Sequence, residues 1–266
     1  MAEPLTKSIK PQDFGSRMNT FVINLDKSVD RLTEITERLD RLGLAFTRVS
    51  AVYGGNLNER ELNQHYDSSL NKRNYRRPLA ASEIGCYLSH RKIWQVVVDK
   101  GLSMALVLED DAAPAPELPA VLAEIELLSH QWDIIKLYEP PAKKSVARSI
   151  PINDRLSLCQ YKKIPSCATG YVVSLAGATK LLGARESFGR PIDDDMQFYW
   201  EYSGNVYGVK PQPIFCAESS QQSTIGINGK TRSRKTFIGT MLGPLLRLAY
   251  EVLRLYHNSR RENLRH

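Results

Sequence analysis

Residues 104–111 read MALVLEDD, and this stretch sets the fold class of the chain. Residues 104–108 form an unbroken apolar run, which is the pattern of a strand buried on both faces of a parallel sheet. The run ends in the carboxylates of residues 109–111, and residues 112–114 (AAP) are expected to stop the strand. The sequence therefore predicts an α/β fold in which one buried strand ends in three acidic side chains.

Glu109, Asp110 and Asp111 repel one another, and a strand end gains little structurally from such a cluster. In open α/β sheets, ligands bind at the carboxyl ends of the strands. A hard divalent cation with oxygen ligands would relieve the repulsion and bring a phosphate-bearing substrate with it. The alternative is a strand that ends at an acidic surface turn, and the motif alone leaves both interpretations open.

The N-terminal part of the chain predicts a βαβ unit. Residues 20–25 are typical of a strand, residues 28–42 of a helix and residues 45–49 of a second strand. Ser28 is expected to cap the helix at its start, and Gly43 to end it. This unit predicts a mostly parallel, Rossmann-like sheet flanked by helices.

The first turn of this unit, NLDKSVDR, contains no glycine. It therefore matches neither a phosphate-binding P-loop nor a dinucleotide fingerprint. Arg31, in the first turn of the helix, could instead reach a phosphate, although a solvent-exposed arginine is the commoner explanation.

Residues 81–101 (ASEIGCYLSHRKIWQVVVDKG) predict a second helix, capped by Ser82. Small residues such as Gly85 and Ser89 would allow its first turns to pack closely against a neighbour or a ligand. A lone histidine on a helix is usually structural, so chemistry for the one in this helix is the less common alternative. Three polar side chains of the helix could point into a site: Glu83, Ser89 and His90.

The rest of the globular part alternates between strands and irregular stretches. Residues 53–78 are polar and predict a long active-site loop or a short helical excursion. Residues 132–138 predict a buried strand in which Lys136 either snorkels to the surface or balances nearby carboxylates. Residues 139–165 contain four prolines and predict a loop or hairpin, and residues 169–182 a strand followed by a helix.

A second acidic cluster follows at Asp193, Asp194 and Asp195, within RPIDDDMQFYWE. The structural explanation is a helix N-terminus, where carboxylates suit the helix dipole. That explanation accounts comfortably for one or two of the three aspartates. The cluster is therefore a second candidate site.

Composition limits the class of protein. The 266 residues are 42% hydrophobic and 24% charged, as in ordinary globular proteins. Four cysteines without a CxxC pair, together with the absence of a sequon or an apolar signal core, favour a reducing cytoplasm. We expect a disordered leader at 1–17, one domain at 18–226 and a basic tail at 227–266.

The net charge of +7 is concentrated in the tail. Residues 230–266 carry nine Lys/Arg against two Glu, which leaves the rest of the chain neutral. The globular part is therefore not a basic nucleic-acid-binding domain, and nucleic acid is not an expected partner.

Residues 237–257 predict an amphipathic helix in this tail. Arg247, Glu251 and Arg254 interrupt any apolar span long enough to cross a membrane. A basic amphipathic helix suits lying on anionic lipid, and packing on the domain is the open alternative. The apolar face of the helix is expected to carry Ile238, Met241, Leu245, Leu248, Val252 and Leu255.

The chain resembles glycosyltransferase family 25, which includes lipooligosaccharide β-galactosyltransferases and collagen galactosyltransferases. The resemblance covers most of residues 19–226 through FVINLDKSVDR, ASEIGCYLSH, LVLEDDA, TGYVVSLAGATKLL, PIDDDM and QSTIG, in that order. It implies a GT-A type transferase with UDP-galactose as donor and Mn²⁺ or Mg²⁺ as cofactor. The chain length and missing signal resemble the lipopolysaccharide branch, which implies a glycolipid or oligosaccharide acceptor at the inner face of a bacterial cytoplasmic membrane.

The resemblance also implies roles for individual residues. EDD looks like the family's version of the DxD element, with Glu109 near the ribose. Asp111, together with Asp110, would bind Mn²⁺ and the diphosphate. The other donor-binding residues that the family motifs imply are Asn24, Arg31, Glu83, Ser89, His90 and Gly170.

Asp193 matches the acidic residue that follows the proline in the family's motif, whereas the next two positions vary in the family. An inverting transfer needs one carboxylate to take the proton from the acceptor hydroxyl, and such general-base assistance typically contributes about 10²–10⁴-fold. We expect Asp193 to be that base, with Asp194 as the second candidate. Either could instead ligate the metal.

Two other function classes remain open. A nucleotidyltransferase that makes a sugar nucleotide would use a glycine-rich loop after the first strand, and NLDKSVDR lacks one. A non-catalytic adaptor that binds anionic membrane through residues 230–266 would bind neither metal nor nucleotide. Binding of UDP with Mn²⁺ separates the adaptor from the two enzymes.

Overall fold

A computed structural model describes five stretches of the chain: residues 18–75, 77–129, 131–140, 146–217 and 237–263. The expected leader at 1–17 and the QSTIG motif lie outside the described residues.

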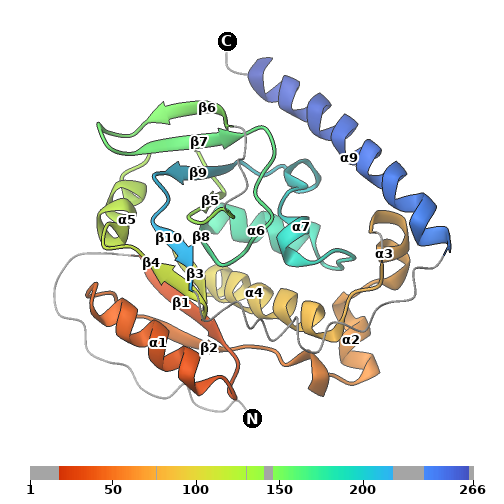
Figure 1. Cartoon of the computed structure of the whole chain (residues 1–266), viewed down its shortest axis with the longest axis horizontal. Coiled ribbons are helices and arrows are strands. Elements are labelled where there is room, and N and C mark those ends of the chain that lie inside the picture. The colour runs from red at the N-terminus through yellow and green to blue at the C-terminus, as the bar shows by residue number, and fades with distance from the viewer. Residues whose placement is uncertain (1–17, 76, 130, 141–145, 218–236, 264–266) are drawn as a thin grey trace.

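An eight-stranded sheet forms the centre of the molecule, in the order β2-β1-β3-β8-β5-β9-β7-β6 (Figure 1). Strands β2, β1 and β3 pair in parallel, as do β5 and β9, whereas β8 and β7 run antiparallel to both of their neighbours. The predicted mostly parallel sheet is confirmed, with two reversed strands that the βαβ pattern did not indicate. The strands span Asn19–Asn24 (β1), Thr47–Ser50 (β2), Met104–Glu109 (β3), Ile134–Lys136 (β5), Val146–Pro151 (β6), Ser157–Tyr161 (β7), Gly170–Ser174 (β8) and Val206–Lys210 (β9).

Strand β3 is covered on both faces, as its unbroken apolar run predicts. Ala105 and Val107 belong to one apolar cluster, and Leu106 and Leu108 to another on the opposite face. All four side chains are fully buried. The acidic residues that follow therefore begin where the covered part of the strand ends.

Helices cover both faces of the sheet. The first cluster includes residues of α4 (Ala81–Asp99) and α6 (Leu175–Ala184), and the second includes residues of α1 (Val29–Asp40) and α5 (Leu118–Glu126). This two-sided arrangement explains why a central strand can be apolar throughout its length.

Residues 112–114 were expected only to end β3, and this expectation is corrected by the structure. Residues 112–114 form a short strand, β4 (Ala112–Pro114), which pairs antiparallel with β10 (Ile214–Cys216). The partner strand lies about a hundred residues away in sequence, so the local composition could not reveal it. Asp110 and Asp111 consequently lie in a turn that is held by a strand on each side.

Two predicted helix caps also differ. Ser28 occupies the N-cap position of α1 but makes no side-chain hydrogen bond to the helix. Helix α4 is preceded by Ala80, so Ser82 lies inside the helix and is not its cap. Glu83, from inside the helix, accepts the N–H of this N-cap residue, Ala80, through its Oε2 at 2.9 Å.

The polar stretch at 53–78 is helical, which confirms one of its two interpretations. It forms a 3₁₀ turn, η1 (Gly54–Asn56), and two short helices, α2 (Glu59–His65) and α3 (Ser68–Asn74). The predicted close packing of α4 is confirmed here, because a Cβ on Gly85 would lie 2.3 Å from the carbonyl oxygen of Val52. The excursion at 139–165 contains the β6–β7 hairpin.

Helix α9 (Phe237–Asn263) lies along the outside of the molecule, near α7 (Ile192–Asp195) (Figure 1). It packs against the 3₁₀ turn η2 (Tyr199–Glu201). No helix of the described chain is long and apolar enough to cross a bilayer. The contacts with η2 show that the predicted amphipathic tail helix is present and packed on the domain.

Candidate functional site

The turn after β3 meets the end of the neighbouring parallel strand β1. Asn24, the last residue of β1, donates from Nδ2 to Oδ2 of Asp110 at 2.9 Å, and Arg31 donates to Oδ1 at 3.3 Å. Asn24 is itself held by Ser28, whose carbonyl accepts at 3.0 Å, and by Arg48, which donates to Oδ1 at 3.0 Å. The structure thus brings three predicted site residues together, with the Asp110 carboxylate fixed by a buried amide and a guanidinium.

Asp111 differs from Asp110 in its hydrogen bonding. Its Oδ1 is buried and has no hydrogen-bond partner from any other described residue. Burial and the negative charges of Glu109 and Asp110 raise the pKa of Asp111 to about 7. A buried carboxylate oxygen without a donor is costly unless something else pairs with it. It fits a hard cation, which would take up the free oxygen without displacing a donor.

Glu109 lies at the end of a hydrogen-bond chain across the core. The Trp94 indole donates to the hydroxyl oxygen of Tyr171 at 2.9 Å, that hydroxyl lies 3.0 Å from Nδ1 of His90, and Nε2 of His90 lies 3.2 Å from Oε1 of Glu109. Because indole can only donate, the Tyr171 proton is left to point at Nδ1. This order places the imidazole proton on Nε2, facing Glu109.

The protonation states fit that order. Burial lowers the pKa of His90 to about 4, so the ring is neutral near pH 7. Burial and the charge of Asp110 raise the pKa of Glu109 to about 7. His90 therefore acts as a neutral donor that steadies the Glu109 carboxylate and fixes its direction.

Cys86, His90 and Glu109 also place three metal-ligating atoms within 4.8 Å of one another. The thiol lies 3.7 Å from Oε1 of Glu109, and burial raises its pKa well above the usual value. A metal ion held by these three would have to remove both the thiol proton and the Nε2 proton. The free oxygen of Asp111 is the better candidate ligand.

The second acidic cluster reaches the first through Asp193. Burial and the charge of Glu109 raise the pKa of Asp193 to about 6, while the charge of Lys136 and, when it is protonated, that of His90 oppose the rise. These influences come from β3, β5 and α4, so α7 brings Asp193 into the same electrostatic neighbourhood as the EDD turn. The convergence of two clusters 82 positions apart (111 to 193) is what a two-carboxylate site requires.

Asp194 is surrounded by neutral donors. Tyr75 donates to Oδ2 at 3.1 Å, and Ser166 and Gln197 donate to Oδ1 at 2.8 and 3.3 Å. Three donors therefore occupy the two oxygens of this carboxylate. This arrangement favours Asp193 over Asp194 as a proton acceptor.

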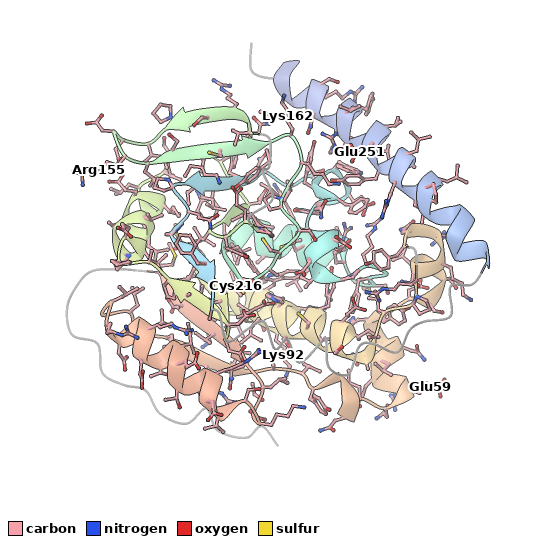
Figure 2. The ribbon with its side chains drawn as sticks, in the orientation of Figure 1. Glu59, Lys92, Arg155, Lys162, Cys216 and Glu251 are labelled. Carbon is pink, nitrogen blue, oxygen red and sulfur yellow. The ribbon has the colours of Figure 1, made fainter. Side chains whose placement is uncertain are left out.

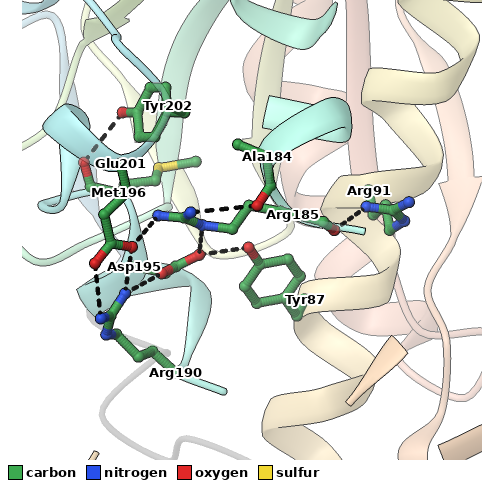
Figure 3. A network of polar contacts seen from close by, with 9 residues as sticks. All are labelled: Tyr87, Arg91, Ala184, Arg185, Arg190, Asp195, Met196, Glu201 and Tyr202. Carbon is green, nitrogen blue, oxygen red and sulfur yellow. Dashed lines mark hydrogen bonds and ion pairs between the residues drawn. The ribbon is translucent and has the colours of Figure 1, made fainter. Parts of the chain in front are cut away.

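Asp195 belongs to a buried ion-pair network (Figure 3). It accepts from Tyr87 at 2.6 Å, from Nε of Arg185 at 2.7 Å and from Arg190 at 3.0 Å. Both arginines also pair with Glu201. Asp195 therefore anchors α7 to α4 and to η2.

The position of Lys136 decides between the two roles that the sequence allowed, reaching the surface or balancing nearby carboxylates. The side chain is buried, and its ammonium donates to the carbonyl oxygen of Cys167. Its positive charge lowers the pKa of both Glu109 and Asp193. It balances the carboxylates and does not snorkel. A lysine within an apolar strand was the signal that could have placed it among the site residues.

Three predicted donor-binding residues make contacts within the fold. Glu83 forms a two-pronged ion pair with Arg77 at 2.6 and 2.7 Å. Ser89 is fully buried and accepts the N–H of Val52 at 2.8 Å. A Cβ on Gly170 would come 2.6 Å from the Ile214 side chain. Their roles in donor binding stay predictions. Tyr171 and Trp94 were missed, because nothing local distinguishes them from core aromatics.

Several known proteins are similar in sequence to the part of the chain that contains this site. The family profile described as "Glycosyltransferase family 25 (LPS biosynthesis protein)" matches residues 18–196. Procollagen galactosyltransferase 1-B of Xenopus laevis is 32% identical over 201 residues, which are 70% of this chain and 31% of that protein. Procollagen galactosyltransferase 2 of Homo sapiens is 32% identical over 186 residues, which are 65% of this chain and 29% of that protein. A glycosyltransferase 25 family member of Anopheles gambiae is 30% identical over 182 residues, which are 65% of this chain and 30% of that protein.

The chain spans under a third of the length of these curated relatives. The profile match nevertheless includes the first βαβ unit, the EDD turn and α7. It therefore contains both acidic clusters and the strands that bring them together. The chain belongs to glycosyltransferase family 25.

Proposed function

We propose that this glycosyltransferase moves galactose from UDP-galactose onto a lipooligosaccharide or lipopolysaccharide glycan, with inversion at the sugar. Membership of the family supports the glycosyltransferase class. The relatives named as galactosyltransferases support the choice of sugar, and the family description supports the acceptor. The observation that carries the proposal is the buried, unpartnered Oδ1 of Asp111 beside the charges of Glu109 and Asp110.

The donor would bind at the carboxyl ends of β1 and β3, in keeping with a GT-A type fold. Mn²⁺ or Mg²⁺, when bound, would neutralise charge on the departing diphosphate as a Lewis acid. Asp111 would hold the cation, and Glu109, oriented by His90, would face the ribose. Asp110 would keep Asn24 and Arg31 in place, leaving the guanidinium at the rim of the site for a phosphate.

The acceptor would approach from the side of α7. Its hydroxyl oxygen would form the new bond to C1 of galactose as the C1–O bond to the diphosphate breaks. The bonding electron pair leaves with UDP, and the acceptor proton passes to Asp193. With a pKa near 6, Asp193 is ionised at neutral pH and still basic enough to assist.

Transfer assays with purified full-length chain test the donor and the metal. We expect sugar release from UDP-galactose in the presence of Mn²⁺, a much slower rate with UDP-glucose, and loss of activity with a chelator. Titration calorimetry of UDP with and without Mn²⁺ gives a readout that does not depend on turnover. UDP binding of equal affinity in both conditions would contradict the metal assignment.

The acceptor needs a separate comparison, because the relatives named above carry procollagen in their names. De-acylated lipooligosaccharide and a collagen peptide are offered in parallel with the same donor. We expect transfer to the oligosaccharide. Transfer to the peptide alone would replace the proposed acceptor while leaving the galactosyltransferase assignment in place.

The two other function classes each have a direct test. Pyrophosphate release from UTP plus galactose 1-phosphate would support a nucleotidyltransferase instead. Failure to bind UDP under any metal condition, together with retained vesicle binding, would support a membrane adaptor. We expect neither result.

A further inference from the structure

Helix α9 is attached to the domain by its aromatic and polar side. The His257 ring stacks on Trp200 with centroids 5.2 Å apart and planes 4° apart. Tyr250 packs edge-on against Phe198 at 5.0 Å. Tyr199 donates to Oδ1 of Asn258 at 2.8 Å. These contacts fix which side of the helix faces the protein.

Polar contacts to the loop after β7 complete this attachment. Arg254 and Asn258 both donate to the carbonyl oxygen of Lys162, at 2.6 and 2.8 Å. Lys163 pairs with Glu251 at 3.4 Å. Figure 2 shows Lys162 and Glu251 on these facing segments. Several independent contacts between Tyr250 and Asn258, about two and a half helical turns, leave little freedom for the helix to roll.

The opposite side of α9 is an apolar stripe that faces away from the domain. Leu245, Leu248, Val252 and Leu255 are spaced as i, i+3, i+7 and i+10, which places them on one face of a helix. They are 63%, 63%, 57% and 59% exposed. A surface helix of a globular protein normally turns such a face inward. This inverted arrangement marks a surface made to be covered by something else.

Charge identifies what covers the stripe. Arg247 and Arg260 are exposed on α9, and residues 230–266 carry the whole net charge of the chain. A second copy docked through the same stripe would bring two positively charged helices together. An anionic bilayer offers apolar depth and opposite charge at once.

We propose that α9 docks this glycosyltransferase on an anionic membrane, lying in the plane of the interface with the apolar stripe inserted. The helix does not have the apolar length to span the bilayer, which agrees with a surface position. The sequence posed membrane binding and packing on the domain as alternatives. The structure shows that one side of α9 packs on the domain while the other stays available, so a single helix can do both.

Hydrogen bonds also connect the docked helix to the candidate catalytic region. Tyr250 of α9 donates to Oε1 of Gln197 at 3.1 Å, and Gln197 in turn donates to Asp194 at 3.3 Å. Two hydrogen bonds therefore separate the docked helix from the second acidic cluster. A membrane-bound α9 would hold that cluster at a fixed height above the lipid, where a lipid-linked glycan is presented.

Vesicle co-sedimentation tests the proposal and needs no sugar donor, so it stands apart from the proposed transfer reaction. The full chain is mixed with vesicles of equimolar phosphatidylcholine and phosphatidylglycerol, or of phosphatidylcholine alone. We expect binding to the anionic vesicles, weakened by salt, and about tenfold weaker binding without phosphatidylglycerol.

Substitution identifies the surface responsible. Leu248→Gln combined with Val252→Gln should weaken binding to the anionic vesicles about tenfold or more, because two aliphatic groups no longer enter the lipid. Leu127→Gln, at an exposed leucine at the end of α5, is the matched control and should bind as the parent does. Thermal unfolding of both variants checks that the domain stays folded.

Three outcomes would overturn the proposal. Absence of binding to either vesicle would reject a lipid surface. Equal binding by the stripe variant would place the contact elsewhere on the protein. A dimer in light scattering that the stripe variant loses, without vesicle binding by the parent, would identify a second copy as the occupant.

Discussion

Asp111 carries the sharpest prediction at the scale of one residue. Its folded-state pKa of about 7 exceeds the ordinary value of 3.8, so between these values the folded chain holds a proton that the unfolded chain has lost. Stability therefore falls as pH rises through this window. We expect Asp111→Asn to melt at a higher temperature than the parent at about pH 8 with a chelator present, by a few degrees. The two should converge at about pH 4.

Mn²⁺ provides the internal control for this prediction. The cation should raise the melting temperature of the parent and leave that of Asp111→Asn unchanged, because the variant has lost the oxygen that binds it. Comparing the two proteins at the same pH also cancels the contribution of His90 to stability. Because the pKa of His90 is lowered in the fold, that contribution decreases stability as pH falls below about 6.5, which is the opposite pH dependence to that of Asp111. An Mn²⁺ response of equal size in both proteins would contradict the assignment.

Asp193 should behave differently when its base function is removed. Asp193→Asn is expected to bind UDP and Mn²⁺ as the parent does, while kcat falls about 10²–10⁴-fold. The parent rate should decline as pH falls through about 6, because protonated Asp193 cannot accept the acceptor proton. The variant should lack that decline. Loss of UDP binding together with turnover would instead indicate a metal ligand.

The three adjacent aspartates show what a sequence can and cannot reveal about such a site. The acidic cluster was predictable, because the composition of PIDDDM stands out from its surroundings. The different environments of its members were not. Asp194 meets Tyr75 and Ser166, whereas Asp195 meets Tyr87. These partners come from distant segments, and only the fold determines which carboxylate each one reaches.

At the scale of the element, α7 depends on Asp195 for its position. Asp195→Ala would leave the guanidinium groups of Arg185 and Arg190 buried without one of their two carboxylate partners. Breaking a buried ion pair on one side typically costs about 3–5 kcal/mol. We expect a loss of unfolding free energy toward the lower end of that range, since Glu201 still pairs with both arginines.

Urea denaturation measures that loss, and Asp193→Asn, two residues away on the same short helix, is the matched control. The control should lose little stability, because the ionised form of Asp193 is disfavoured by burial. Equal losses in the two variants would show that the position in the helix matters more than the ion-pair network.

Individual elements were predictable to the extent that their own residues determine them. The run at 104–108 specified a strand covered on both faces, and its burial confirms it. The short strand β4 was missed because the strand that pairs with it, β10, lies about a hundred residues away in sequence. The cap of α4 was misplaced by two residues, because the helix begins after Ala80, whose N–H is accepted by the side chain of Glu83.

At the scale of the whole molecule, the tail was predicted as amphipathic but its orientation was not. Periodicity identifies the apolar face of a helix and assumes that the protein covers it. On α9 the aromatic ring of Trp200 and the backbone around Lys162 bind the polar side instead. Contacts of this kind depend on surface groups that no periodic pattern records.

Trp200→Ala tests whether α9 is held as described. The change removes the ring on which His257 stacks and which lies 5.7 Å from the Tyr250 ring. Aromatic pairs contribute about 0.5–1.5 kcal/mol beyond their buried area, so α9 should detach about fivefold more often or more. Limited trypsin digestion should then cut at Arg254 faster, while a fragment that contains the central sheet stays protected. Phe215→Ala, at an exposed aromatic of β10, should leave the cleavage rate unchanged. An unchanged rate in Trp200→Ala would mean that the contacts to Lys162 hold α9 by themselves, and the stripe would then keep its direction without the aromatic stack.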